Sequence, residues 1–191
     1  MGKYNLFNFF IILMLLSTFV QNVSAQDSFD PDELFLDARK LILEGKRVEG
    51  RAIAFRILDK YPSYADVLIL VGRSYSWDGA YDSASVYFER AIDASPAYQD
   101  AYVAYIDNLF WSENYEKAEL IIDKGIQQIG PQSSLLMYRK SRLFYYKEEY
   151  DDALKVAREV FEKDNKIEGL LTYIQTLQRL GRNNAVGATY D

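Results

Sequence analysis

The chain has 191 residues, a formal net charge of −6, and neither histidine nor cysteine. Without these two residue types the sequence cannot build serine–histidine or cysteine–histidine catalysis, an ordinary zinc or haem site, or a disulfide framework. An acidic chain without basic clusters also argues against binding to nucleic acid. We therefore expect no metal, no cofactor and no nucleic-acid partner.

The first 25 residues have the composition of a secretory signal peptide. Lys3 supplies an early positive charge, residues 6–20 are apolar except for one asparagine, one serine and one threonine, and residues 23–25 are Val-Ser-Ala. A run of 15 residues is shorter than the roughly 20 that a transmembrane helix needs, so cleavage after Ala25 is favoured over an anchor. No cysteine follows the run, which excludes a lipoprotein. The sequence predicts an exported chain that starts at Gln26.

Beyond this leader the sequence repeats with a period of 34 residues. Residues 62–95 align with residues 96–129, and Trp77 aligns with Trp111. A fixed period of this size is typical of a stacked solenoid, in which each unit contacts only its neighbours.

The units follow in chain order and differ in regularity. Residues 31–61 form a degenerate first unit in which Gly50 stands where alanine is usual, and residues 62–95 form the most regular one. In the third unit Gly125 replaces an alanine, and Pro131 comes one residue late, which shifts the fourth unit by one. Residues 167–180 have the apolar spacing of a single helix, which would cap the last pair. We expect helices throughout residues 32–181, in a repeat domain of residues 26–181.

The regular unit carries small and aromatic residues at fixed offsets. Gly72 and Ala84 are small where its two helices are expected to approach, while Tyr75, Phe88 and Ala91 are expected to fill the gap against the next unit. These offsets resemble those of the tetratricopeptide repeat. The resemblance implies an all-α fold, a tetratricopeptide-repeat α-solenoid of about four helix pairs plus a capping helix. The last ten residues add a short strand-like C-terminal tail.

The tail, residues 182–191, lacks helical spacing. In an extended chain Val186, Ala188 and Tyr190 would point to one side. An apolar side that ends in tyrosine is typical of the first strand of an outer-membrane barrel. The alternative is a frayed polar tail.

Two segments with similar patterns mark the expected helix turns. They read Trp-Asp-Gly-Ala-Tyr at residues 77–81 and Trp-Ser-Glu-Asn-Tyr at residues 111–115. Together with the leader and the tail, they resemble the N-terminal part of YaiO-type outer-membrane β-barrel proteins. That resemblance implies a periplasmic repeat domain ahead of a barrel. Closure needs at least eight strands, and this chain stops one strand into the barrel, so we expect a fragment or a repeat domain with a vestigial tail.

The concave surface of such a stack is lined by the first helix of each pair, and three offsets would point into it. These offsets carry arginine or aspartate at one and aromatic rings at the other two, a combination that suits sugar faces or an extended peptide. The nine candidate binding residues are Arg39, Arg73, Trp77, Asp107, Phe110, Trp111, Arg142, Tyr145 and Tyr146.

Structural explanations for the same residues remain open. Trp77 and Trp111 could seal the helix turns against Tyr81 and Tyr115, which lie four residues further on. The arginines could instead form salt bridges between helices with Asp107.

The function expected from these patterns is a non-enzymatic periplasmic interaction module. Its concave groove would bind a protein segment or an envelope glycan, and it would be the N-terminal domain of a YaiO-like barrel protein. The outer membrane is a partner only if the chain continues into a barrel. The alternative is a free-standing soluble periplasmic adaptor in envelope assembly.

Overall fold

The computed structural model describes residues 29–164 and 167–181. Within these residues the chain forms nine helices and no strand, which confirms the expected all-α fold. None of these helices combines the length and the apolar character that a bilayer span requires. The predicted signal peptide (1–25) and strand-like tail (182–191) lie outside the described residues, so both stay predictions.

The helices form four pairs and one final helix, as the 34-residue period predicts. The bounds of the pairs and of the cap are α2 Pro31–Leu43 with α3 Arg47–Lys60, α4 Ala65–Trp77 with α5 Tyr81–Ala94, α6 Gln99–Trp111 with α7 Tyr115–Ile129, α8 Ser134–Tyr146 with α9 Tyr150–Asp164, and α10 Ile167–Arg179.

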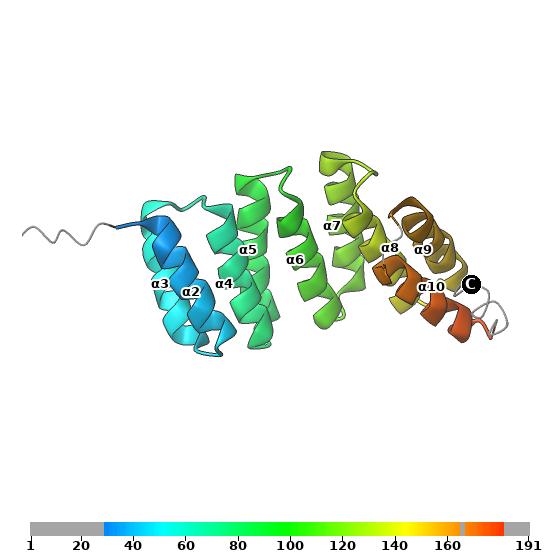
Figure 1. Ribbon diagram of the computed structural model, residues 1–191, viewed down its shortest axis with the longest axis horizontal. Coiled ribbons are helices and arrows are strands. Elements are labelled where there is room, and N and C mark those ends of the chain that lie inside the picture. Colours follow the sequence, from blue (N-terminus) through cyan, green and yellow to red (C-terminus); the bar gives the residue numbers. More distant parts are fainter. Residues whose placement is uncertain (1–28, 165–166, 182–191) are drawn as a thin grey trace, which may run out of the picture.

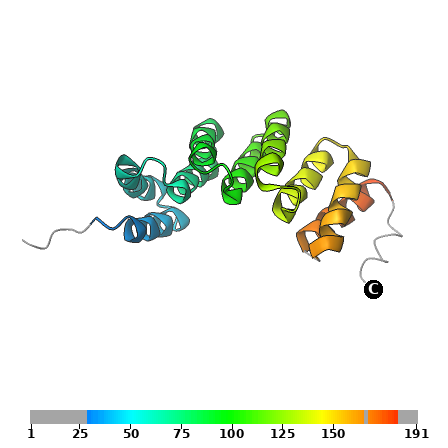
Figure 2. The ribbon, with the colours of Figure 1, turned by 90° about the horizontal axis from the view of Figure 1, so that it is seen from above.

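The pairs stand side by side in an elongated stack (Figure 1). Seen from above, α3, α5 and α7 follow one side of the stack and α2, α4 and α6 follow the other (Figure 2). Each first helix packs closely against the first helix of the next unit, whereas the second helices stand further apart and meet through their side chains, as Phe55 and Tyr87 do. The first helices are therefore closer together, and they form the inner face of the curved stack.

All four turns within the pairs share one backbone conformation. The residue at the equivalent turn position has positive φ in every unit, at Gly45 (85°), Gly79 (76°), Glu113 (56°) and Glu148 (62°). In the second unit the turn closes with a 3.0 Å hydrogen bond from the Ala80 backbone N–H to a backbone carbonyl of α4. The left-handed conformation is unfavourable for a glutamate, so the stack imposes it on the third and fourth turns.

The close approach of α4 and α5 at Gly72 is confirmed. A Cβ atom there would lie 2.6 Å from the Phe88 ring, which is fully buried. Phe88 also reaches the next unit, where its ring centroid lies 5.8 Å from that of Tyr105. The expected role of Phe88 between units is therefore observed.

Tyr75 packs differently from what the sequence predicts. Its ring stacks on Tyr87 of its own unit, with centroids 5.6 Å apart, and the Arg51 guanidinium of the preceding unit lies 4.4 Å above it. The Tyr75 side chain thus faces back toward α3 rather than forward, and Tyr87 lies on that side as well, with its ring centroid 6.0 Å from that of Phe55.

The irregular units have structural causes. A Cβ at Gly50 would lie 2.7 Å from the Ala38 carbonyl oxygen, so α2 and α3 cross too closely for the usual alanine. At Gly125 the side chains of Tyr102 and Leu136 lie against the glycine and leave little room for a Cβ atom. The late Pro131 is matched by α7, which has 15 residues where α5 has 14.

Candidate functional site

The inner face is identified by a salt bridge that joins two first helices. Asp107 on α6 accepts two hydrogen bonds from the Arg139 guanidinium on α8, at 2.9 and 3.3 Å. Asp107 therefore lies at the seam between first helices, on the inner side of the stack. Arg39, Arg73 and Arg142 have the same offset in their units, which places them along the same seam.

The N-terminal half of the inner face has two free arginines. Arg39 on α2 and Arg73 on α4 are both exposed. Neither forms an ion pair or a hydrogen bond with another of the residues that the structure describes. Two guanidinium groups are thus available to a ligand on adjacent first helices.

Exposed apolar side chains run beside these arginines. Trp77 is 40 % exposed and Trp111 50 % exposed, and each lies four residues after the arginine–aspartate offset, on the same face of its helix. No ring pair among the described residues includes either tryptophan. The rings therefore do not stack on Tyr81 or Tyr115, which weakens the interpretation that they only seal the turns.

Leu43 extends this row and was missed from the sequence. It lies 34 residues before Trp77, at the end of α2, and is 63 % exposed. The 34-residue period could have identified Leu43, because it is the residue one period before Trp77.

The C-terminal half of the inner face is occupied by its own side chains. The Arg142 guanidinium lies 5.3 Å from the ring centroids of both Phe110 and Tyr146 and donates a hydrogen bond to the Tyr146 hydroxyl. Phe110 is only 6 % exposed, because Arg142 and Tyr146 cover it. The expected inward-facing ring at residue 110 is thus part of the packing.

Tyr145 and Tyr146 continue this cluster toward the cap. Tyr146 stacks on Tyr115 with centroids 5.5 Å apart, and Tyr145 meets Tyr150 edge-on at 5.8 Å. The Tyr145 hydroxyl accepts a 3.1 Å hydrogen bond from Arg179 of α10. Of the nine candidates, the structure leaves Arg39, Arg73, Trp77 and Trp111 open, and it engages Asp107, Phe110, Arg142, Tyr145 and Tyr146 in contacts within the chain.

A second set of inter-unit contacts repeats with the period. The Tyr64 hydroxyl donates to Asp32 at 2.7 Å, and the Tyr98 hydroxyl donates to Asp66 in the same way one unit later. These hydrogen bonds to a carboxylate stabilise the neutral phenol and raise the pKa of both tyrosines to about 12. Both the tyrosine and the aspartate of this hydrogen bond recur after one 34-residue period, so the contact could have been predicted from the sequence.

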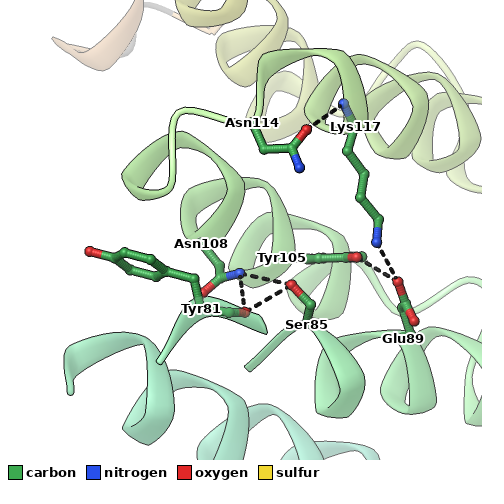
Figure 3. Close-up of polar contacts among 7 residues, drawn as sticks. All are labelled: Tyr81, Ser85, Glu89, Tyr105, Asn108, Asn114 and Lys117. Atoms are coloured by element: carbon green, nitrogen blue, oxygen red, sulfur yellow. Dashed lines mark hydrogen bonds and ion pairs between the residues drawn. The ribbon is translucent and has the colours of Figure 1, made fainter. Parts of the chain in front are cut away.

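A polar network fills the interface between the second and third units (Figure 3). The buried Asn108 side chain donates to the Tyr81 carbonyl at 3.2 Å and to the Ser85 hydroxyl at 3.1 Å. It also accepts a 2.5 Å hydrogen bond from the Ser76 hydroxyl of α4. Asn108 is therefore satisfied by both helices of the preceding unit.

The same interface carries an ion pair at its outer edge. The Glu89 carboxylate accepts hydrogen bonds from the Tyr105 hydroxyl at 2.6 Å and from the Lys117 ammonium at 2.9 Å (Figure 3). These donors hold the pKa of the Glu89 carboxyl below its usual range. A cavity of about 190 Å³ between α5 and α7 is lined by both residues. Because Glu89 and Lys117 pair with each other, we assign this cavity to the interface between units.

Comparison with known proteins confirms the repeat. A family model for the tetratricopeptide repeat matches residues 77–136. A search of curated proteins finds no match. The YaiO-type resemblance stays a prediction.

Solved structures share the fold. A tetratricopeptide repeat protein from Parabacteroides merdae ATCC 43184 is 15 % identical with a TM-score of 0.72, over 87 % of this chain and 65 % of that chain. MamA from Desulfovibrio magneticus RS-1 is 13 % identical with a TM-score of 0.67, over 84 % of this chain and 92 % of that one. YrrB, a TPR protein with an unusual peptide-binding site, is 17 % identical with a TM-score of 0.60, over 86 % and 84 %. Residues 77–136 thus match the tetratricopeptide repeat, and the described chain has the fold of a tetratricopeptide-type α-solenoid.

Proposed function

We propose that this protein is a non-enzymatic interaction module whose inner face binds a segment of another protein. The observation that carries the proposal is the free pair Arg39 and Arg73 beside the exposed rings of Trp77 and Trp111. Exposed tryptophan and arginine are the side chains that most often dominate binding energy at protein interfaces. The fold supports this function, because YrrB, a similar structure, has a peptide-binding site.

An envelope glycan is the second candidate ligand. Flat indole rings repeated on neighbouring helices suit the faces of sugar rings, and Trp77 and Trp111 have this arrangement. Against it, Asp107 is held by Arg139, so the acceptor expected for sugar hydroxyls is already engaged. We therefore favour the protein segment.

The experiment that tests this function removes the two rings. The double substitution Trp77→Ala and Trp111→Ala is expected to weaken binding of peptides selected from a random phage-displayed dodecapeptide library by at least about tenfold, since one buried aromatic contact contributes about 1.4 kcal/mol or more. Isothermal titration calorimetry measures the affinities, and thermal melting should change little because both side chains are partly exposed.

A matched control lies on the outer face. Val86 on α5 and Leu120 on α7 are also exposed apolar residues 34 positions apart. Their replacement by alanine should leave the affinity unchanged. Failure to select any peptide, or equal binding to the tryptophan double variant, would contradict the proposed function.

The cellular setting belongs to the same proposal. Residues 1–25 would direct export to the periplasm, and the repeat domain would precede a YaiO-like barrel; the alternative is a free periplasmic adaptor. Mass spectrometry of the protein from a Gram-negative host should show a chain that starts at Gln26. For the product of the gene's complete reading frame, retention in the outer membrane after a carbonate wash would favour the barrel, whereas release with the periplasmic fraction would favour the adaptor. A chain that keeps Met1 would rule out cleavage of the leader.

A further inference from the structure

We propose that the segment bound by the inner face is acidic and adopts the polyproline II conformation. Carboxylates at every third residue would contact Arg39 and Arg73, and apolar side chains at every third residue would contact Trp77 and Trp111. This inference rests on the proposed function and specifies its ligand.

The charge of the ligand follows from which arginines are unpaired. Arg139 is paired with Asp107, and Arg142 is surrounded by aromatic rings and bonded to Tyr146. Arg39 and Arg73 remain exposed, with no ion pair or hydrogen bond to the residues that the structure describes. Guanidinium groups bind carboxylates through paired hydrogen bonds, so an acidic segment complements this half of the face.

The position of the segment follows from the acids nearby. Asp32 and Asp66 lie seven residues before Arg39 and Arg73 on the same helices, about 10 Å away along the helix axis. They repel an acidic ligand from the loop side of the arginines. The tryptophans lie on the opposite side, one turn further along, so the segment runs between the arginine row and the tryptophan row.

The conformation follows from the spacing of the helices. Adjacent packed helices lie about 8–10 Å apart, which sets the separation of the two arginines and of the two tryptophans. A polyproline II segment brings every third residue to the same side at intervals of about 9 Å. A β-strand repeats on one side at about 7 Å, which does not match.

The length of the segment follows from the closed end of the face. Beyond Trp111 the cluster around Arg142 and Tyr146 occupies the surface. Only α2, α4 and α6 remain open, a span of about 20 Å. About six or seven residues in the polyproline II conformation cover that distance.

The probe for this inference is the dodecapeptide made of four Ser-Glu-Phe triplets. The protein's only two tryptophans are Trp77 and Trp111, so its intrinsic fluorescence reports on this surface. At about 50 mM NaCl, where screening is weak, we expect a saturable fluorescence change. Glutamine and lysine analogues of the peptide, and a peptide of equal composition with its glutamates in one block, should bind at least tenfold more weakly. An analogue with proline in place of serine should bind at least as tightly, since proline favours polyproline II.

Charge-matched variants locate the contact. Arg73→Gln should weaken the acidic peptide at least tenfold. Arg56→Gln removes another exposed arginine, from the second helix α3, and should change the affinity less than twofold. The acidic ligand is refuted if the acidic peptide does not bind or if the glutamine or lysine analogue binds as tightly. Loss of binding by the proline analogue, or tight binding of the block peptide, refutes polyproline II.

These outcomes are separate from a failure of the proposed function. If selected phage peptides lose affinity for the tryptophan double variant but are not acidic, the proposed function stands and the acidic ligand is wrong. If no selected peptide depends on the two tryptophans, the proposed function fails as well.

Discussion

Replacing Phe88 with alanine should lower the free energy of unfolding by about 3–5 kcal/mol, the usual range for removing a fully buried aromatic ring. Phe88 has no exposed surface, and it contacts α4 at Gly72 and α6 at Tyr105. The substitution therefore leaves a void at both the centre of the second unit and its interface with the third. Urea unfolding followed by circular dichroism at 222 nm measures the loss.

A control substitution is available on the same helix. Val86 is 54 % exposed on α5, and Val86→Ala should change the free energy of unfolding by no more than about 0.5 kcal/mol. A loss below about 1 kcal/mol for Phe88→Ala would contradict the packing described here. In a solenoid, a weakened central interface also divides the stack, so two unfolding transitions are expected in place of one.

The second large effect is expected at Asn108. Replacing this buried residue with leucine removes its hydrogen bonds and leaves the hydroxyl of Ser76 without its acceptor. An orphaned buried polar group costs about 1–3 kcal/mol, and we expect a destabilisation in that range.

A double-mutant cycle separates the effect of the unsatisfied Ser76 hydroxyl from the effect of the different side-chain shape of leucine. Adding Ser76→Ala to Asn108→Leu removes the orphaned hydroxyl, so the double variant should be more stable than the single Asn108→Leu variant. If the two losses simply add, the bond between Ser76 and Asn108 makes no net contribution. Thermal and urea unfolding of the four proteins provide the measurement.

The fold was predictable from the sequence because the same pair of helices repeats every 34 residues. The turn at Gly79 recurs at the equivalent position of every unit, and the single capping helix follows the fourth pair as expected. In a repeat protein each unit gives separate sequence evidence for the same helix-pair geometry. Gly50 and Gly125 depart from the pattern for structural reasons, since Gly50 marks a close crossing of α2 and α3 and Gly125 leaves room for the side chains of Tyr102 and Leu136.

Whether each inner-face residue is unpaired or engaged in contacts within the chain was less predictable from the sequence. Alignment gives Arg73 and Arg142 the same offset, yet only Arg73 is free, because aromatic rings surround Arg142. Likewise Asp107 pairs with Arg139 rather than with an arginine of its own row. Such differences depend on which side chains neighbouring units supply, and a single-unit pattern does not contain that information.

The one-sided contacts between units have a consequence for how the surface tolerates change. Because the first helices pack closely along the stack and the second helices stand further apart, the inner edge of the curved molecule is its shorter edge. The second helices pack on the first helices of their own units and spread apart on the outer side of the stack. We therefore expect substitutions at exposed outer positions such as Val86 and Leu120 to leave the inner face unchanged. New charges, tags or contact sites could therefore be introduced on the outer surface while the spacing of the first helices stays the same.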